Sequence, residues 1–215
     1  YFYFKLHHYL LNNMISTSEF RKLIDSCSSY SELIPYLQIM VDQRMTKECG
    51  NSCLHALALL NQEHLKYSEW LSLFTKVMNG FTEDKFDKST YPSLMRVYCN
   101  PFGYQFLESQ GGFMSTVENF LDIMNQKGIT LRKRTLSPLL ELSSTQKMST
   151  LGMSVFALGK VHNITFDSLD LAYLLSSSVS FDRQTILREI VATQTTFSQM
   201  AIDHLGTKFT THDYT

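Results

Sequence analysis

The protein is a chain of 215 residues, of which 44% are hydrophobic and 18% are charged. This amount of apolar material excludes a disordered tail and predicts an ordered core. The formal net charge of −1 excludes a globally basic protein, so a nucleic-acid partner would have to meet a local basic patch. No stretch approaches the roughly 18 consecutive apolar residues that a membrane span requires, and we therefore expect no membrane segment.

The start of the sequence and its cysteines bear on the protein's location and metal content. Residues 1–11 lack an initiator methionine and the features of a signal peptide, so we expect the interior of a longer gene product. Cys49 and Cys53 could share one helical face, with His55 nearby. A zinc site would need a second ligand pair at a typical spacing, and none follows. We interpret the cysteines as buried and reduced, as in an intracellular protein, and expect no metal or cofactor in this chain.

Apolar residues recur mostly three and four positions apart, and no segment sustains the alternation of a strand. The sequence therefore predicts an all-α protein. We expect a repeat array over residues 1–194, followed by an exit helix and linker over residues 195–215. The array would hold about five helical hairpins, at residues 17–43, 51–79, 89–127, 135–159 and 168–193.

Short polar signals predict where individual helices begin and end. Ser68 is expected to cap the second helix of the second hairpin, which Gly80 then ends. Ser115 and Glu118 have the spacing of a capping box and predict a helix start. Residues 100–112 form a longer connection than an ordinary hairpin turn, and we interpret them as an insertion.

One sequence phrase recurs with a fixed period. It consists of Gly or Asn, then Ile, and then three leucines, the first of them seven positions after the Ile. The two copies lie 35 residues apart and consist of Gly128, Ile129, Leu136, Leu139 and Leu140, and of Asn163, Ile164, Leu171, Leu174 and Leu175. Such a period is typical of helical hairpins that bury their apolar faces only against their neighbours. The pattern predicts a stacked binding surface.

Signature residues distinguish two families that share this period. The Trp, Leu-Gly and Tyr pattern of tetratricopeptide repeats is absent. Residues 89–99, Ser-Thr-Tyr-Pro-Ser-Leu-Met-Arg-Val-Tyr-Cys, resemble the first helix of a pentatricopeptide repeat, and residues 120–129 resemble the second helix with its exit turn. Residues 128–140 resemble the Gly-Ile-x-Pro-Arg-x-Arg-Ser-Tyr-x-Pro-Ala-Leu stretch of protein-only RNase P, with Leu131 in place of the first proline. From about Ser89 to Leu205, the chain resembles the pentatricopeptide part of that family.

This resemblance implies a superhelical arm that grips the folded elbow of precursor tRNA. In the family, a zinc-containing connector and a magnesium-dependent nuclease domain follow in the same chain and remove the 5′ leader. We therefore expect a parent endoribonuclease, mitochondrial or nuclear, with zinc and magnesium only in a C-terminal part beyond this segment. The nuclease's aspartate clusters have no counterpart here, because Asp167 with Asp170 and Asp84 with Asp87 are isolated pairs in predicted turns. No catalytic residue is assigned.

The candidate RNA contacts surround the Gly128 phrase. Lys127, Arg132, Lys133 and Arg134 form the only dense basic cluster of the sequence. Such a charge run is often an ordinary solvated surface, but Arg132 and Arg134 match the arginines of the family stretch. Arginine suits RNA because its planar group can hydrogen-bond phosphate with two parallel bonds or stack on a base. We expect this cluster and Lys160 to line a basic groove.

Pentatricopeptide repeats that read single-stranded RNA use one polar residue on the first helix and another just before the next helix. The corresponding pairs here are Ser93 with Lys133 and Pro138 with Ser168, and neither is a usual base-reading pair. We therefore expect recognition of RNA shape and backbone, with Ser93 among the contacts.

Several other residues admit two interpretations. We expect Tyr91 in the core, while Tyr98 could belong to the core or stack on a base. His204, and His212 with Asp213, lie in a predicted terminal tail and carry no catalytic or metal assignment. A different class of function also stays open, a scaffold that binds a protein in an organellar ribosome or RNA-processing complex. A basic groove would favour RNA, and an apolar groove would favour a protein.

Overall fold

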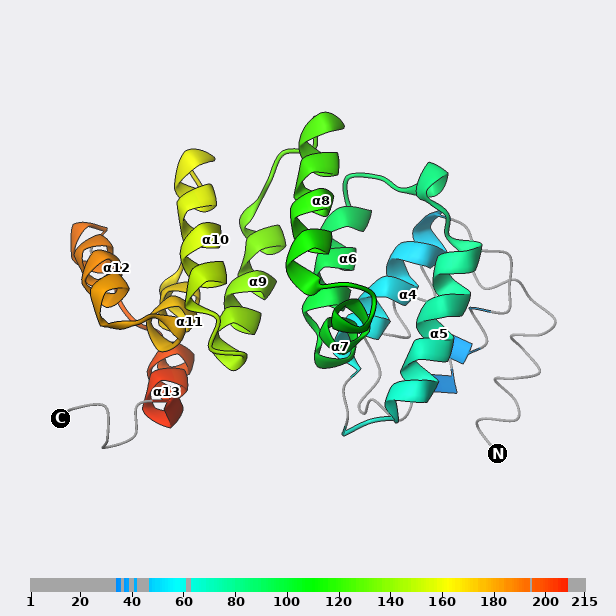
Figure 1. Cartoon of the computed structure of the whole chain (residues 1–215), viewed down its shortest axis with the longest axis horizontal. Coiled ribbons are helices and arrows are strands. Elements are labelled where there is room, and N and C mark those ends of the chain that lie inside the picture. Colours follow the sequence, from blue (N-terminus) through cyan, green and yellow to red (C-terminus); the bar gives the residue numbers. More distant parts are fainter. Residues whose placement is uncertain are drawn as a thin grey trace. The chain divides into compact units, whose positions relative to one another are not determined.

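The computed structural model describes residues 34–35, 37–38, 41, 47–60, 63–193 and 195–208, so most of the first predicted hairpin lies outside the described residues. The described part consists of helices joined by turns, which confirms the all-α prediction (Figure 1). Within it, none of the helices combines the length and apolar character that a bilayer crossing requires. The elements are α4 (Lys47–Leu59), α5 (Tyr67–Gly80), η1 (Glu83–Lys85), α6 (Thr90–Cys99), α7 (Pro101–Ser109), α8 (Phe113–Gln126), α9 (Lys133–Thr145), α10 (Ser149–Val161), α11 (Ser168–Ser177), α12 (Ser180–Ala192) and α13 (Gln199–Lys208).

The chain divides into two units, of which the first ends at Gln110. In unit 1, α4 packs against α5 and α6, and α7 packs against α5 and α6. Trp70 is fully buried in this core, stacks on Phe74 with 5.1 Å between ring centroids, and donates its indole N–H to the Leu57 carbonyl at 3.2 Å. The buried Asn100 side chain donates to the Leu60 carbonyl at 2.6 Å and so satisfies a free acceptor at the end of α4.

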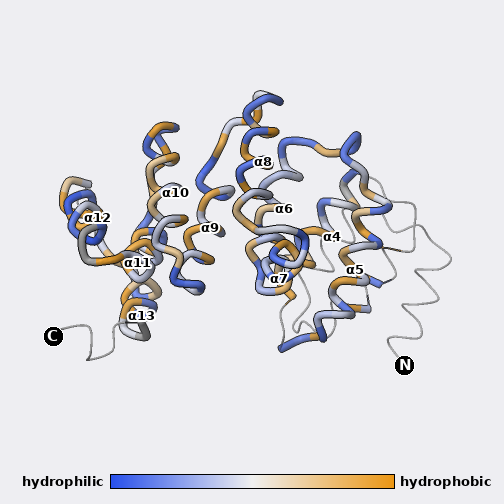
Figure 2. Tube along the Cα trace, in the orientation of Figure 1, coloured by the Kyte–Doolittle hydropathy of each residue, from blue (hydrophilic) through white to orange (hydrophobic). Residues whose placement is uncertain are grey.

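Unit 2 begins at Gly111 and repeats one packing arrangement. The helix α9 packs against α10 and α11, and α11 packs in turn against α10, α12 and α13. Figure 2 shows that hydrophobic and hydrophilic residues alternate around these helices, as expected where each has one buried face. The leucines of both copies of the repeated phrase are all buried, at positions 136, 139, 140, 171, 174 and 175. The period in the sequence therefore corresponds to the core of unit 2.

The 35-residue phrase also fixes two helix ends with the same backbone geometry. Gly128 follows α8 with a φ of +64°, and Asn163 follows α10 with a φ of +53°. In each turn the next residue, Ile129 or Ile164, donates its N–H to a carbonyl five residues earlier, at 2.8 Å. This left-handed termination satisfies carbonyls at the helix end, and Gly and Asn are the residues that tolerate it best.

Two predicted helix starts were wrong. The helix α5 begins at Tyr67, so Ser68 is not its cap, and the carboxylate of Glu69 accepts the Lys66 backbone N–H at 2.9 Å. The helix α8 begins at Phe113, because Gly111 and Gly112 turn the chain with positive φ and the buried Phe113 side chain anchors the first turn. Ser115 therefore lies inside α8, where its hydroxyl donates to the Gly112 carbonyl at 3.1 Å, and the predicted capping box is not formed.

Most of the predicted insertion at residues 100–112 is the helix α7. The side chain of Asn100 accepts the Phe102 N–H at 2.9 Å. Pro101 occupies the first helical position, where a backbone N–H would have no partner within the helix, so its absence in proline costs nothing. A Cβ at Gly103 would overlap the carbonyl oxygen of Val97 in α6. Gly103 thus permits a close crossing of α6 and α7, whereas proline and glycine in the sequence were read as signals of a loop.

Candidate nucleic-acid interface

The predicted basic cluster surrounds the start of α9 in unit 2. Arg132 is the last residue before the helix, has an extended backbone, and provides no capping hydrogen bond from its side chain. Arg132 and Arg134 are exposed and contact no acid among the described residues. The backbone N–H groups of Lys133 and Arg134 also find no acceptor in the described part of the chain. In Figure 2, this entrance to α9 is hydrophilic.

This helix start favours an anion. Free N–H groups and the positive end of the helix dipole attract negative charge, and side chains of Asp or Ser usually satisfy them. Two arginines stand there instead, next to donors that point out of the helix end. The arrangement is suited to a phosphate group, which could accept hydrogen bonds from both the backbone and the guanidinium groups.

Lys133 differs from its two arginine neighbours because acids of the next repeat hold it. Its ammonium forms an ion pair with Asp167 and lies 3.4 Å from Oδ2 of Asp170. Burial alone would lower the pKa of Lys133, but these two carboxylates outweigh it and raise the pKa. The Asp170 side chain is only 4% exposed, and burial raises its pKa. Lys133 is therefore committed to a contact between α9 and α11.

The same two acids form the start of α11. The carboxylate of Asp167 accepts the N–H groups of Leu169 and Asp170, both at 3.0 Å, and Asp170 accepts the Asp167 N–H at 3.2 Å. Burial opposes ionisation of Asp167, but the bonds from Lys133 and from these amides hold its pKa below the usual range. The expectation that Asp167 and Asp170 lie in a turn was wrong for Asp170, which belongs to the first turn of the helix.

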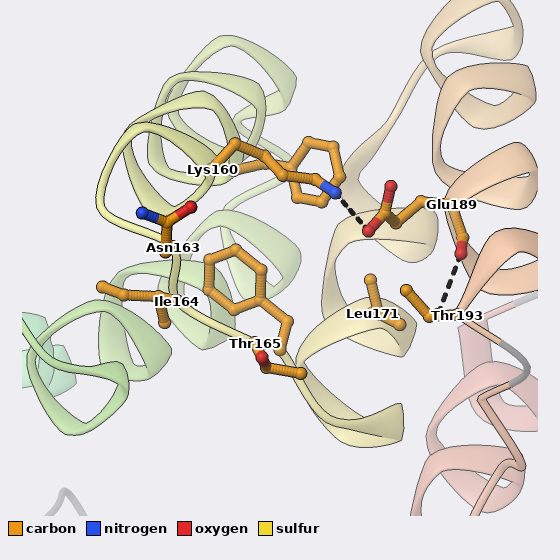
Figure 3. A pocket seen from close by; sticks show the side chains of 9 residues that line it. Lys160, Asn163, Ile164, Thr165, Leu171, Glu189 and Thr193 are labelled. Carbon is orange, nitrogen blue, oxygen red and sulfur yellow. Dashed lines mark hydrogen bonds and ion pairs between the residues drawn. The ribbon is translucent and has the colours of Figure 1, made fainter.

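Lys160 faces a different partner. It lies near the end of α10, forms an ion pair with Glu189 of α12, and has its ammonium 5.6 Å from the centre of the Phe156 ring. Figure 3 shows Lys160 and Glu189 reaching toward each other across a hollow of about 340 Å³. Phe166 and Asn163 also line it. The structure thus places Lys160 in a contact between α10 and α12.

Lys127 lies at the end of α8, where its side chain is exposed. A second hollow, of about 670 Å³, lies beside this turn. Its walls combine apolar residues with the acids Glu118 and Asp122, and His162 completes the rim. The acids make this hollow a poor place for phosphate, so the favourable surface for an anion is the entrance to α9.

The other predicted contacts belong to unit 1. Ser93 is half-buried, and its hydroxyl donates to the Ser89 carbonyl at 3.2 Å. Tyr98 is also half-buried, with its ring edge-on to Phe74 at 6.3 Å, and burial raises its pKa. Tyr91 is 2% exposed, which confirms its place in the core. No single described unit contains all of the predicted RNA contacts.

The two cysteines that the sequence placed on one helical face lie in unit 1. Cys49 and Cys53 are buried in α4, as predicted, and their mutual hydrogen bond together with burial raises the pKa of Cys53 well above its usual value. Among the described residues, no three His, Cys, Asp or Glu side chains gather as a metal site would require. His212 and Asp213 lie outside those residues.

One polar seam was missed in the sequence. His204 lies in α13, not in a tail, and its Nε2 is 2.9 Å from the Ser144 hydroxyl of α9 and 3.2 Å from the Ser176 hydroxyl of α11. Its ring also packs edge-on against Tyr173, with 4.7 Å between centroids. The serines that follow the leucines in both copies of the phrase were the available signal. The seam joins α9, α11 and α13, three alternate helices of unit 2.

Comparison with known proteins identifies the fold. No protein-family model matches this sequence, and no curated protein sequence matches it either. The structure is similar to the crystal structure of the pentatricopeptide-repeat domain of Arabidopsis thaliana protein-only RNase P 1 in complex with tRNA. The TM-score is 0.61 at 14% sequence identity, and the match covers 89% of this chain and 98% of that chain. The protein therefore has the helical-repeat fold of a pentatricopeptide-repeat domain.

Proposed function

We propose that this protein is an RNA-binding repeat domain that recognises the folded elbow of precursor tRNA for removal of the 5′ leader. The observation that carries the proposal is the start of α9, where exposed Arg132 and Arg134 flank backbone donors without an acceptor among the described residues. The fold supports RNA as the partner, because a domain of the same fold is known in complex with tRNA.

A phosphate at this position would complete the helix. It would accept hydrogen bonds from the free N–H groups, as a capping Asp or Ser does at other helices. Its negative charge would also offset the unfavourable positive charge of the two arginines at the helix N-terminus. Each guanidinium can donate two parallel hydrogen bonds to phosphate oxygens. The site recognises the RNA backbone and carries no base information of its own.

Recognition of a folded RNA fits the residues at the base-reading positions. Pro138 has no side-chain donor or acceptor, and the Ser168 hydroxyl is engaged with Ser198, accepting its N–H at 3.1 Å and lying 3.2 Å from its hydroxyl. Lys133 is held by the acids of α11. The unit therefore offers few groups to read single bases, and we infer recognition of shape and backbone.

The test is binding of a fluorescent precursor tRNA to the 215-residue chain over a series of salt concentrations. Removing both arginines, by Arg132→Ala with Arg134→Ala, should weaken binding and lower the slope of log K against log salt by about two units, since each phosphate contact contributes about one. A matched control removes two other exposed cations of the chain, by Lys88→Ala with Arg188→Ala. Equal losses in both double variants, or no loss in the first, would contradict the proposal.

A second function is favoured by a separate observation. Exposed apolar side chains lie on α12 and α13, namely Leu187, Val191, Met200 and Ile202. Such residues suit a protein partner, and they support the alternative of a scaffold within an organellar ribosome or RNA-processing complex. A protein that failed to bind any tRNA, and whose Leu187→Ser with Val191→Ser variant lost a protein partner, would favour the scaffold.

The nuclease activity is assigned to a domain in cis beyond this segment, where the zinc and magnesium would also lie. The domain would then act in mitochondria or in the nucleus. On this proposal the 215-residue chain binds precursor tRNA and leaves it intact, and gel analysis of the bound RNA after incubation with magnesium checks this. Specific release of the 5′ leader by this chain alone would contradict the assignment.

A further inference from the structure

A contact between the first helices of neighbouring hairpins recurs in both units, between α4 and α6 in unit 1 and between α9 and α11 in unit 2. In unit 1, Lys47 is the first residue of α4, and its ammonium lies 3.1 Å from Asp87, which accepts the backbone N–H groups of Ser89 and Thr90 at the start of α6. In unit 2, Lys133 is the first residue of α9 and pairs with Asp167, which accepts the N–H groups at the start of α11. Each lysine therefore joins the start of one helix to the capping acid of a neighbouring one.

Unit 2 adds a second acid to this contact. Asp170 is buried, and its Oδ2 lies 3.4 Å from the Lys133 ammonium. If Lys133 moved away to meet a phosphate, Asp170 would be left as a buried charge without its cation, and an uncompensated buried charge is strongly unfavourable. With Lys133 in place, two carboxylates still face one ammonium, so the start of α11 carries excess negative charge.

We propose that Asp167 and Asp170 determine where RNA lies at this turn, by withholding Lys133 from phosphate and repelling the RNA backbone from the start of α11. The phosphate contact is then confined to Arg132 and Arg134. This inference rests on the proposed RNA-binding function and makes the two acids specificity-determining residues for it. Lys133 becomes a positioning residue, which orients the entrance of α9 and does not touch RNA.

The repulsion between these acids and the RNA backbone acts over a short range. Like charges placed opposite one another at a binding surface disfavour the wrong arrangement strongly, and this discrimination is a common means of fixing register. Arg132 and Asp167 occupy equivalent positions before α9 and α11, 35 residues apart. The start of α9 thus attracts the RNA backbone, and the equivalent start of α11 repels it.

The test measures precursor-tRNA binding against salt for the whole 215-residue chain, with thermal unfolding as a check of folding. Lys133→Ala should leave the salt slope unchanged while lowering the melting temperature. Asp167→Asn with Asp170→Asn should free Lys133, raise the slope by about one unit and tighten binding several-fold. Asn is chosen because it also caps helices well. Adding Lys133→Ala to this double variant should remove the gain.

Two outcomes would overturn the inference. One is a loss of about one unit of slope from Lys133→Ala in the otherwise native chain, and the other is an unchanged slope in a folded Asp167→Asn, Asp170→Asn protein. If that double variant does not fold, Asp167→Asn alone should raise the slope partially, and an unchanged slope there counts against the inference. Failure of the RNA function itself is recognised separately, because the Arg132 and Arg134 substitutions would then leave tRNA binding unaffected.

Discussion

The turn that leads from α8 into α9 and the turn that leads from α10 into α11 share one backbone and differ in chemistry. Both end a helix with a left-handed residue, Gly128 or Asn163, and both continue with an isoleucine that closes the helix end. The position just before the next helix is Asp167 in one turn and Arg132 in the other. Asp167 stabilises its helix, whereas Arg132 leaves its helix uncapped and open to an anion. In a repeat protein, one position can thus serve either stability or binding.

A second difference between these turns concerns packing. Gly159 near the end of α10 leaves space for the ring of Phe166, and a Cβ at Gly159 would overlap that ring. The equivalent positions at the other turn, 35 residues earlier, hold the larger Met124 and the smaller Leu131. Met124 is fully buried. Bulk is therefore divided differently between helix and turn in the two copies.

The largest expected effect on stability comes from giving the turn after α10 the side chains of the turn after α8. Gly159→Met should destabilise the protein by about 2–3 kcal/mol, because the new side chain overlaps Phe166 in a packed core. Adding Phe166→Leu should recover most of that loss, since the pair then resembles the other turn. Urea denaturation of both variants and of Phe166→Leu alone gives the coupling free energy.

Gly206→Met provides the matched control, because Gly206 lies in α13 and a Cβ there meets no atom within 4 Å. It should be neutral or slightly stabilising, as glycine disfavours a helix interior. A similar loss at both glycines would show that the overlap with Phe166 is not the cause.

The left-handed residues should respond differently to substitution. Gly128→Ala should cost about 1–2 kcal/mol, because a Cβ at a φ of +64° is strained even though no neighbouring atom obstructs it. Gly128→Asn should cost less than half of this, since Asn163 occupies the equivalent position. Thermal or urea unfolding measures both. Equal costs for Ala and Asn would mean that the two turns are not equivalent in solution.

The capping acid gives a prediction that depends on pH. Asp167→Ala should destabilise the protein by about 1 kcal/mol at pH 7, since α11 loses its cap. The folded-state pKa of Asp167 lies below the ordinary value of 3.8, so its stabilisation is present above that pH and is lost as the pH falls further. The free-energy difference between the two proteins should therefore shrink in acid. Asp170 has a raised pKa, so its own contribution to stability changes with pH in the opposite direction. Because Asp170 is present in both proteins, this contribution does not enter the difference between them.

The smallest effect tests the exchange of stability for binding directly. Arg132→Asp should stabilise the protein by about 0.5–1 kcal/mol, because it supplies the cap that α9 lacks. The same change should weaken tRNA binding more than Arg132→Ala does, since it adds a repulsive charge at the phosphate position. Denaturation and tRNA titration of the two variants check both parts. A stabilised variant that bound tRNA normally would separate the cap from RNA recognition.

Much of the fold could be predicted because it is encoded in local periodicity. The leucine spacing located the core of unit 2, and residues 120–129 were correctly interpreted as the end of a helix with its exit turn. The helix before Asn163 was expected to end at Gly159, but it continues to Val161. Helix starts were less well predicted. At α8 a polar signal at Ser115 competed with two glycines and a buried Phe113, and the turn and the packing decided the outcome. The helix α7 was missed because Gly103 serves a close helix crossing and not a loop.

The sequence by itself determined the all-helical repeat, its 35-residue period and the placement of the two arginines within one copy of the phrase, because each depends on neighbours along the chain. Only the tertiary structure decided which cations remain open to a ligand. Lys133 and Lys160 have the same charge as Arg132 in the sequence, yet Asp167 and Glu189, 34 and 29 residues further on, hold them in ion pairs. Such pairing depends on how helices of neighbouring hairpins are rotated against each other, and composition and spacing do not specify that rotation.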